Sequence, residues 1–193
     1  YSSGDNPFSF RRCRPQGIFS CPLGFERPPL TGYELDPDGQ GVTGMKDPYR
    51  PIGVFDSGVG GLTVCRKIAE TLPAESIVYL GDTARVPYGS KSPATVIRYA
   101  QACANLLVQH NIKLLVIACN TASAFALETL QSTLPIPTLG VVEPGARAAC
   151  SSSKTGRIGV IGTRGVIASG VYVKTIQHLR PETQVYGVPC PLF

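Results

Sequence analysis

The fold of this chain is decided by the stretch Leu114-Leu115-Val116-Ile117-Ala118-Cys119-Asn120-Thr121-Ala122-Ser123-Ala124. Its first five residues are apolar, include two β-branched side chains, do not alternate with polar residues and are too few for a helix. They predict a strand that is buried on both faces, as parallel sheets require. The cap-type residues Asn120 and Thr121 then open a helical pattern that continues to Leu130, so a strand-to-helix turn is expected here.

Cys119 follows this predicted strand at its carboxyl end. In open α/β sheets ligands bind at such turns, and the positive end of a helix dipole favours a thiolate over a thiol. Cys119 is therefore a candidate base or nucleophile. The alternative is that it fills the core, since cysteine is among the most buried residue types.

The same strand, turn and helix pattern recurs on both sides of this stretch. Strands are expected over residues 52–55, 76–80, 136–142, 157–162 and 184–188, and helices over residues 63–72, 93–109, from 146 onward, and 168–179. A recurrence about every 30 residues is typical of βαβ units. The predicted fold class is therefore α/β, a parallel sheet with flanking helices.

Polar residues follow several of these strands. Asp56 and Ser57 open a glycine-rich turn, 56–62, whose N–H groups suit an anion. The turn has neither a Walker lysine nor a GxGxxG spacing, which favours a carboxylate ligand over a nucleotide. Residues 81–92 form a long polar loop, and Glu143 follows the fourth strand, where on its own it would be interpreted as a solvated carboxylate.

A cysteine near carboxylates, with no metal cluster, phosphate loop or neighbouring histidine, suits proton removal from carbon. The seven cysteines form no CxxC pair and only two histidines are present, so reduced thiols in a cytoplasmic protein are expected, with no metal site and no cofactor. No apolar run approaches the length of a membrane span, so no membrane partner is expected.

Overall composition sets further bounds. With 193 residues, 43% of them hydrophobic and 16% charged, the chain suits one soluble domain plus an incomplete piece. The net charge of +5 does not indicate nucleic-acid binding, because four of the 18 basic residues fall in the first 27 positions and no basic stripe follows.

Residues 1–44 are rich in turn-forming residues and have no periodicity. The only methionine, Met45, lies shortly before the first predicted strand. We therefore expect residues 1–44 to be a disordered or non-native extension, with a targeting peptide as the alternative.

Five blocks, taken in order, resemble bacterial glutamate racemases of the aspartate/glutamate racemase superfamily: Ile52–Val64, Gly81–Ser92, Ala118–Ala124, Val142–Ala146 and Ile158–Thr163. The resemblance extends from about Pro51 to the last residue. It implies a cofactor-independent isomerase that interconverts L- and D-glutamate and supplies D-glutamate for peptidoglycan in cell-wall biogenesis. Two pseudo-symmetric α/β domains are implied, residues 45–143 as the first and 144–193 as the beginning of the second, often in a homodimer.

The resemblance also implies roles for individual residues. Cys119 would remove the α-proton, Asp56 would assist it and contact the substrate amino group, and Glu143 would assist proton transfer or order the pocket. Substrate binding falls to Asp56 together with Ser57, Tyr88, Gly89, Asn120 and Thr121, which would hold the carboxylates through hydroxyl, amide and backbone donors.

One block of the family has no counterpart in this sequence. The second catalytic cysteine of such racemases lies in a Gly-Cys-Thr-His block that is expected beyond Phe193, and Cys190 does not match it. The chain is therefore expected to be a C-terminally truncated fragment. An aspartate racemase, a related single-cysteine enzyme and an inactive glutamate-binding fragment remain as alternatives.

Overall fold

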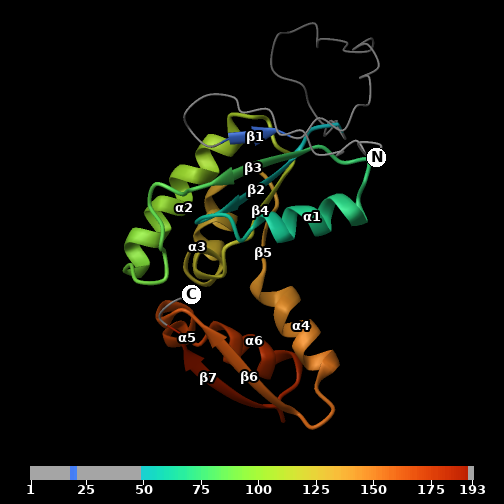
Figure 1. Ribbon diagram of the computed structural model, residues 1–193, viewed down its shortest axis with the longest axis vertical. Coiled ribbons are helices and arrows are strands. Elements are labelled where there is room, and N and C mark those ends of the chain that lie inside the picture. Colours follow the sequence, from blue (N-terminus) through green and yellow to red (C-terminus); the bar gives the residue numbers. More distant parts are fainter. Residues whose placement is uncertain (1–17, 21–48, 191–193) are drawn as a thin grey trace, which may run out of the picture.

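The computed structural model describes residues 18–20 and 49–190. Figure 1 shows their arrangement. In chain order the elements are β1 (Ile18–Ser20), β2 (Ile52–Asp56), α1 (Leu62–Thr71), β3 (Ile77–Gly81), α2 (Pro93–Val108), β4 (Leu114–Ile117), α3 (Asn120–Thr133), β5 (Thr138–Gly140), α4 (Val142–Ser152), β6 (Arg157–Gly162), α5 (Arg164–Ser169), α6 (Val171–Leu179) and β7 (Gln184–Pro189).

The larger sheet has the strand order β1-β3-β2-β4-β5. Strands β3, β2, β4 and β5 are parallel, and Gly53 of the central strand β2 pairs with Val78 on one side and Leu115 on the other. All five residues of β2 are buried. Because parallel strands end at the same edge, this order brings the turns after β2, β3 and β4 side by side.

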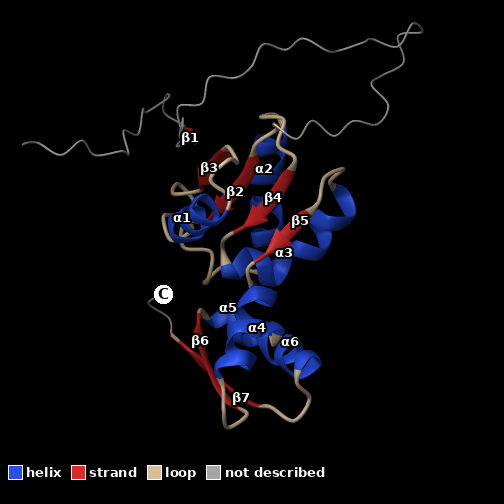
Figure 2. Ribbon diagram, turned by 90° about the vertical axis from the view of Figure 1, so that its right-hand side faces the viewer, coloured by secondary structure: helices blue, strands red, loops and turns tan. Residues whose placement is uncertain are grey.

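Helices cover both faces of this sheet (Figure 2). Alternate residues of a strand point to opposite faces, so Phe55 and Ile117 pack with buried residues of α2 and α3. Their neighbours Val54 and Val116 pack on the other face, against Ile68 and other apolar residues of α1. The continuous apolar runs that predicted buried strands therefore supply side chains to two separate layers of the core, one on each face of the sheet.

Strands β6 and β7 form a separate two-stranded parallel sheet. One side is covered by α4 and α6, whose Ala146 and Ile176 pack against Ile158 of β6. We call residues 49–141 together with β1 the larger lobe, and residues 142–190 the smaller lobe. Figure 2 shows the larger lobe above the smaller one, with the start of α3 facing the smaller lobe.

The predicted parallel α/β architecture is confirmed, but several element boundaries differ. The fourth predicted strand, 136–142, is shorter, and α4 begins at Val142 rather than at residue 146. Proline is tolerated in a first helical turn, where N–H groups have no intrahelical partner, so Pro144 does not delay the helix. The helix predicted over residues 168–179 is interrupted at Gly170, which has a left-handed conformation with φ 65°: α5 begins earlier, at Arg164, and α6 begins at Val171.

The expectation for residues 1–44 falls outside the described residues, except for Ile18–Ser20. These three residues form β1, an edge strand antiparallel to β3 that the sequence did not predict. Among the described helices, none is both long and apolar enough to cross a membrane.

Candidate active site

Cys119 is the N-cap residue of α3, two residues after the end of β4. Its Sγ accepts a hydrogen bond from the N–H of Ala122 at 3.4 Å, and its thiol donates to Ser57 Oγ at 3.3 Å. Only 6% of the residue is exposed. The thiol therefore lies at the positive end of a helix, as the strand-to-helix interpretation predicted. It is also largely withdrawn from water and packs in the core, as the alternative interpretation predicted.

The turn after β2 lies beside this cysteine. Asp56 is buried, and its Oδ2 accepts the N–H of Gly58 at 2.9 Å. A Cβ at Gly61 would lie 2.6 Å from Asp56 Cβ and 2.9 Å from Ala118 Cβ, so only glycine fits where the turn passes the two strand ends. This close approach keeps Ser57 within reach of Cys119.

Tyr79 supports the same turn from β3. Its hydroxyl donates to the carbonyl oxygen of Gly58 at 2.9 Å. Burial, with the negative charge of Asp56 nearby, raises the pKa of Tyr79 above its usual range, so the hydroxyl stays protonated and able to donate. Some N–H groups of the turn, those of Gly58, Leu62 and Thr63, are used inside the turn and are not open to an anion as the sequence indicated.

Two hydroxyl groups of the smaller lobe reach the start of α3. Thr121 Oγ1 lies 3.2 Å from Thr163 Oγ1, and the Tyr172 hydroxyl donates to Asn120 Oδ1 at 2.7 Å. Sequence reasoning did not select Thr163 or Tyr172 as site residues. Thr163 carried a signal as the cap residue of α5, whereas the contact of Tyr172 depends only on tertiary packing.

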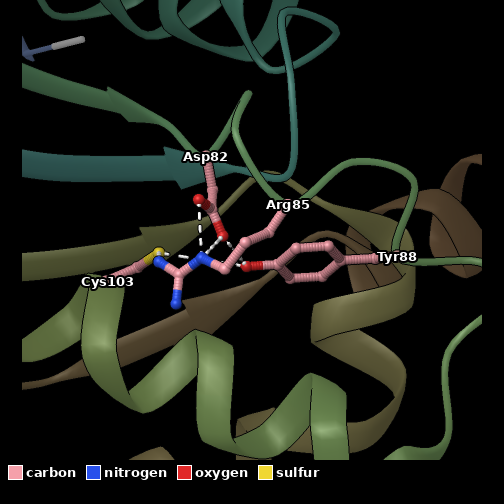
Figure 3. Close-up of polar contacts among 4 residues, drawn as sticks. All are labelled: Asp82, Arg85, Tyr88 and Cys103. Atoms are coloured by element: carbon pink, nitrogen blue, oxygen red, sulfur yellow. Dashed lines mark hydrogen bonds and ion pairs between the residues drawn. The ribbon is translucent and has the colours of Figure 1, made fainter. Parts of the chain in front are cut away.

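The Tyr88 side chain lies in the core, whereas the Gly89 backbone packs against the smaller lobe. The Tyr88 side chain is 1% exposed, and its hydroxyl donates to Asp82 and lies 3.9 Å from Cys103 Sγ (Figure 3). Since the hydroxyl proton is already used, only the backbone of this segment is available to a ligand. Gly89 packs against Thr163, where a Cβ would lie 2.5 Å from two carbon atoms of the threonine side chain.

Glu143 lies in the first turn of α4 and not at the end of a strand, which corrects its expected location. Its side chain is 61% exposed and pairs with Arg147, four residues further along the helix, at 2.7 Å. The contacts described for Glu143 do not bring it to Cys119.

The arrangement supports acid–base chemistry on an anionic ligand. The first N–H groups of a helix have no intrahelical partner, so those of Asn120 and Thr121 can bind a carboxylate. Within the described residues, no group of three or more His, Cys, Asp and Glu side chains gathers to hold a metal ion.

Comparison with known proteins agrees with this description. A family model described as Asp/Glu/Hydantoin racemase matches residues 52–189. The glutamate racemase of Geobacter metallireducens is 59% identical over 146 residues, which are 76% of this chain and 54% of the relative. That of Aquifex aeolicus is 54% identical over 142 residues, covering 74% and 55% of the two chains.

Solved structures of glutamate racemases also match. The Bacillus anthracis structure has a TM-score of 0.72 at 48% identity, covering 74% of this chain and 54% of the other. The Francisella tularensis structure, a complex with D-glutamate, has a TM-score of 0.69 at 42% identity, covering 75% and 54%. The chain thus spans about half the length of the curated relatives it matches. Since the family match includes β2 to β7 and the cysteine that caps α3, the chain belongs to the Asp/Glu/Hydantoin racemase family.

Proposed function

We propose that the protein carrying this chain is a glutamate racemase, which interconverts L- and D-glutamate without a cofactor by moving a proton at the α-carbon. The observation that carries the proposal is the position of Cys119, a buried thiol at the start of α3, between the Ser57 hydroxyl and the Ala122 N–H. The similarity to glutamate racemases supports glutamate as the substrate.

Cys119 is the proposed base on one face of the α-carbon. Its thiolate takes the α-proton, and the electron pair left on carbon spreads into the adjacent carboxylate. The helix N-terminus favours this added negative charge, and the N–H groups of Asn120 and Thr121 are placed to bind the carboxylate oxygens. Because these donors are already oriented, they require little rearrangement during the reaction.

Asp56 and Ser57 are proposed to act at the same edge of the sheet. The Asp56 carboxylate suits the substrate ammonium group and assists Cys119, and the Ser57 hydroxyl binds substrate beside the thiol. The backbone of Tyr88 and Gly89 is proposed to hold the second carboxylate. Glu143 is proposed only to order the start of α4, because its negative charge lies in the first turn, at the positive end of that helix.

Inversion requires an acid on the opposite face of the α-carbon. Within residues 49–190, the contacts described for Cys119 include no second thiol. We therefore assign the opposite acid, a second cysteine by resemblance to the family, to the part of the relatives' length that this chain does not span. The D-glutamate formed is proposed to supply peptidoglycan synthesis in the cytoplasm.

Exchange of the glutamate α-proton in D2O, followed by NMR, tests the proposal in the intact protein. Replacing Cys119 with alanine is expected to slow exchange about 10³-fold, within the range of a single general base. Cys150→Ala is the matched control, because this thiol lies on α4 in the smaller lobe, and exchange is expected to be unchanged.

Two outcomes of this experiment would count against the proposal. Undiminished exchange in Cys119→Ala would refute the role of the thiol. Faster exchange of L-aspartate than of either glutamate enantiomer would instead favour the aspartate racemase alternative.

A further inference from the structure

A largely buried polar cluster lies in the larger lobe next to the candidate active site, and consists of Asp82, Arg85, Tyr88 and Cys103 (Figure 3). Asp82 follows β3, is 7% exposed and donates its N–H to the carbonyl oxygen of Asp56 at 2.9 Å. Its carboxylate accepts a hydrogen bond from Arg85 Nε at 2.9 Å and one from the Tyr88 hydroxyl. A buried carboxylate is costly without such partners, so the three side chains constrain one another.

The Tyr88 ring is fixed from a second direction by the core. It belongs to the buried cluster beneath α2 and packs at 51° against the Tyr99 ring, with 5.7 Å between the centroids. The Arg85 guanidinium lies 4.7 Å above the centroid of the same Tyr99 ring. The tyrosine is therefore held at both its ring and its hydroxyl, and the backbone that follows it has little freedom.

Gly89, the next residue, is where the larger lobe meets the start of α5. A Cβ on Gly89 would lie 2.5 Å from Thr163 Cβ and Cγ2, and a Cβ on Gly165 would lie 3.4 Å from the Gly89 carbonyl oxygen. Thr163 rests directly on this backbone and in turn contacts Thr121 at 3.2 Å. The location of Gly89 thus controls a contact beside Cys119.

We propose that Asp82 and Arg85 are positioning residues. By holding Tyr88, they fix the position of Gly89 against Thr163, and we call this Gly89–Thr163 contact the seat. The seat in turn sets the Thr121–Thr163 contact between the lobes. Asp82 and Arg85 touch no ligand themselves. The consequence for glutamate affinity rests on the proposed function, whereas the consequence for the start of α5 does not.

Amide hydrogen exchange of the intact protein tests the seat without any ligand. Tyr88→Phe removes the hydroxyl and keeps the buried ring. We expect exchange at Val166 and Ile167, whose N–H groups bond to Thr163 Oγ1 and O, to accelerate at least about tenfold. The N–H of Ser123, bonded to Cys119 O, should keep its wild-type rate.

Tyr99→Phe is the matched control. This neighbouring ring also loses a hydroxyl, and the hydrogen bonds described for the chain include none from that hydroxyl, so wild-type exchange is expected. Asp82→Asn is a second route to the same effect, because it keeps the side-chain shape and removes the charge that pairs with Arg85. Wild-type exchange at Val166 in both Tyr88→Phe and Asp82→Asn would overturn the proposal, as would uniform acceleration that includes Ser123.

Calorimetric titration with D- and L-glutamate is the second measurement. We expect Tyr88→Phe to weaken binding about tenfold while the alkylation rate of Cys119 stays unchanged, because Ser57 and the Ala122 N–H do not belong to the seat. Equal affinity in wild type and Tyr88→Phe overturns the link between the seat and the ligand. Absence of glutamate binding in the wild type contradicts the proposed function, and hydrogen exchange still decides whether the seat exists.

Discussion

Replacing Gly89 with alanine should separate the two lobes locally. The added Cβ would lie 2.5 Å from two carbon atoms of Thr163, roughly 1 Å closer than an ordinary carbon–carbon contact. Gly89 is not among the described glycines with a left-handed backbone, so the cost comes from this contact and not from backbone strain. The neighbouring atoms belong to a short side chain close to its own backbone, so they cannot swing away.

The expected magnitude has two parts. Overpacking of this kind costs about 1–3 kcal/mol. A displacement of Thr163 by roughly 1 Å would also break its 3.2 Å contact with Thr121, which adds about 0.5–1.5 kcal/mol. We therefore expect Gly89→Ala to lower the free energy of unfolding by about 1.5–4.5 kcal/mol and to weaken glutamate binding.

Urea denaturation of the intact protein measures the first effect, and calorimetry with glutamate measures the second. Gly159→Ala is the matched control, because no atom lies within 4 Å of the Cβ it would add, and it should change the free energy of unfolding by less than about 1 kcal/mol. Gly89→Ala combined with Thr163→Ser removes one of the two overlapping carbons and should recover part of the loss. Wild-type stability and affinity in Gly89→Ala would refute the reasoning.

Three further outcomes are expected. Ser123→Ala should lower the free energy of unfolding by about 2–3 kcal/mol, since its buried hydroxyl both donates to a carbonyl of β4 and accepts an N–H before α4. Burial, with a nearby carboxylate, raises the pKa of Cys65 to about 12 and that of Cys103 to about 11. At pH 8 fewer than about one in 1,000 of these groups is a thiolate, so iodoacetamide should label both slowly in the folded protein, as mass spectrometry of peptides can show. Tyr172→Phe should weaken glutamate binding about fivefold in calorimetry, because the Asn120 amide loses the partner that orients it.

Each of these outcomes has a control on the same chain. Ser132→Ala removes an exposed hydroxyl of α3 and should leave the urea midpoint unchanged, so an equal loss in both serine variants would contradict the first expectation. Rapid labelling of Cys65 and Cys103 at pH 8, at the rate seen in denatured protein, would contradict the second. Tyr186→Phe loses a hydroxyl on exposed β7, and the third expectation fails if it weakens binding as much as Tyr172→Phe does.

Local sequence was sufficient where the interactions that fix the position of a residue involve only its neighbours in the chain. The helix predicted over residues 93–109 begins at Pro93, a residue tolerated in the first helical turn, and the Ser92 side chain caps it. The apolar run before Cys119 predicted a buried strand, and the cap-type residues after it predicted the turn. In each case the deciding interactions lie within a few residues, so the pattern carries them.

Local sequence was misleading about which partner a polar side chain meets in the folded chain. Glu143 was expected at a strand end, but α4 begins one residue earlier and pairs it with Arg147. The Tyr88 hydroxyl was a candidate ligand for substrate, but packing beneath α2 directs it to Asp82. A side chain's type shows which bonds it can make and not which partner folding brings to it.

The sequence by itself determined the parallel α/β class, the place of Cys119 at the start of a helix and the glycine-rich turn after the first predicted strand, because periodicity and capping are properties of neighbouring residues. Only the tertiary structure decided that Ser57 lies against a thiol 62 residues away, and that Thr163 and Tyr172 reach α3 from the smaller lobe. The strand order that joins these segments depends on burying both faces of β2 at once, and no short stretch of sequence contains that requirement.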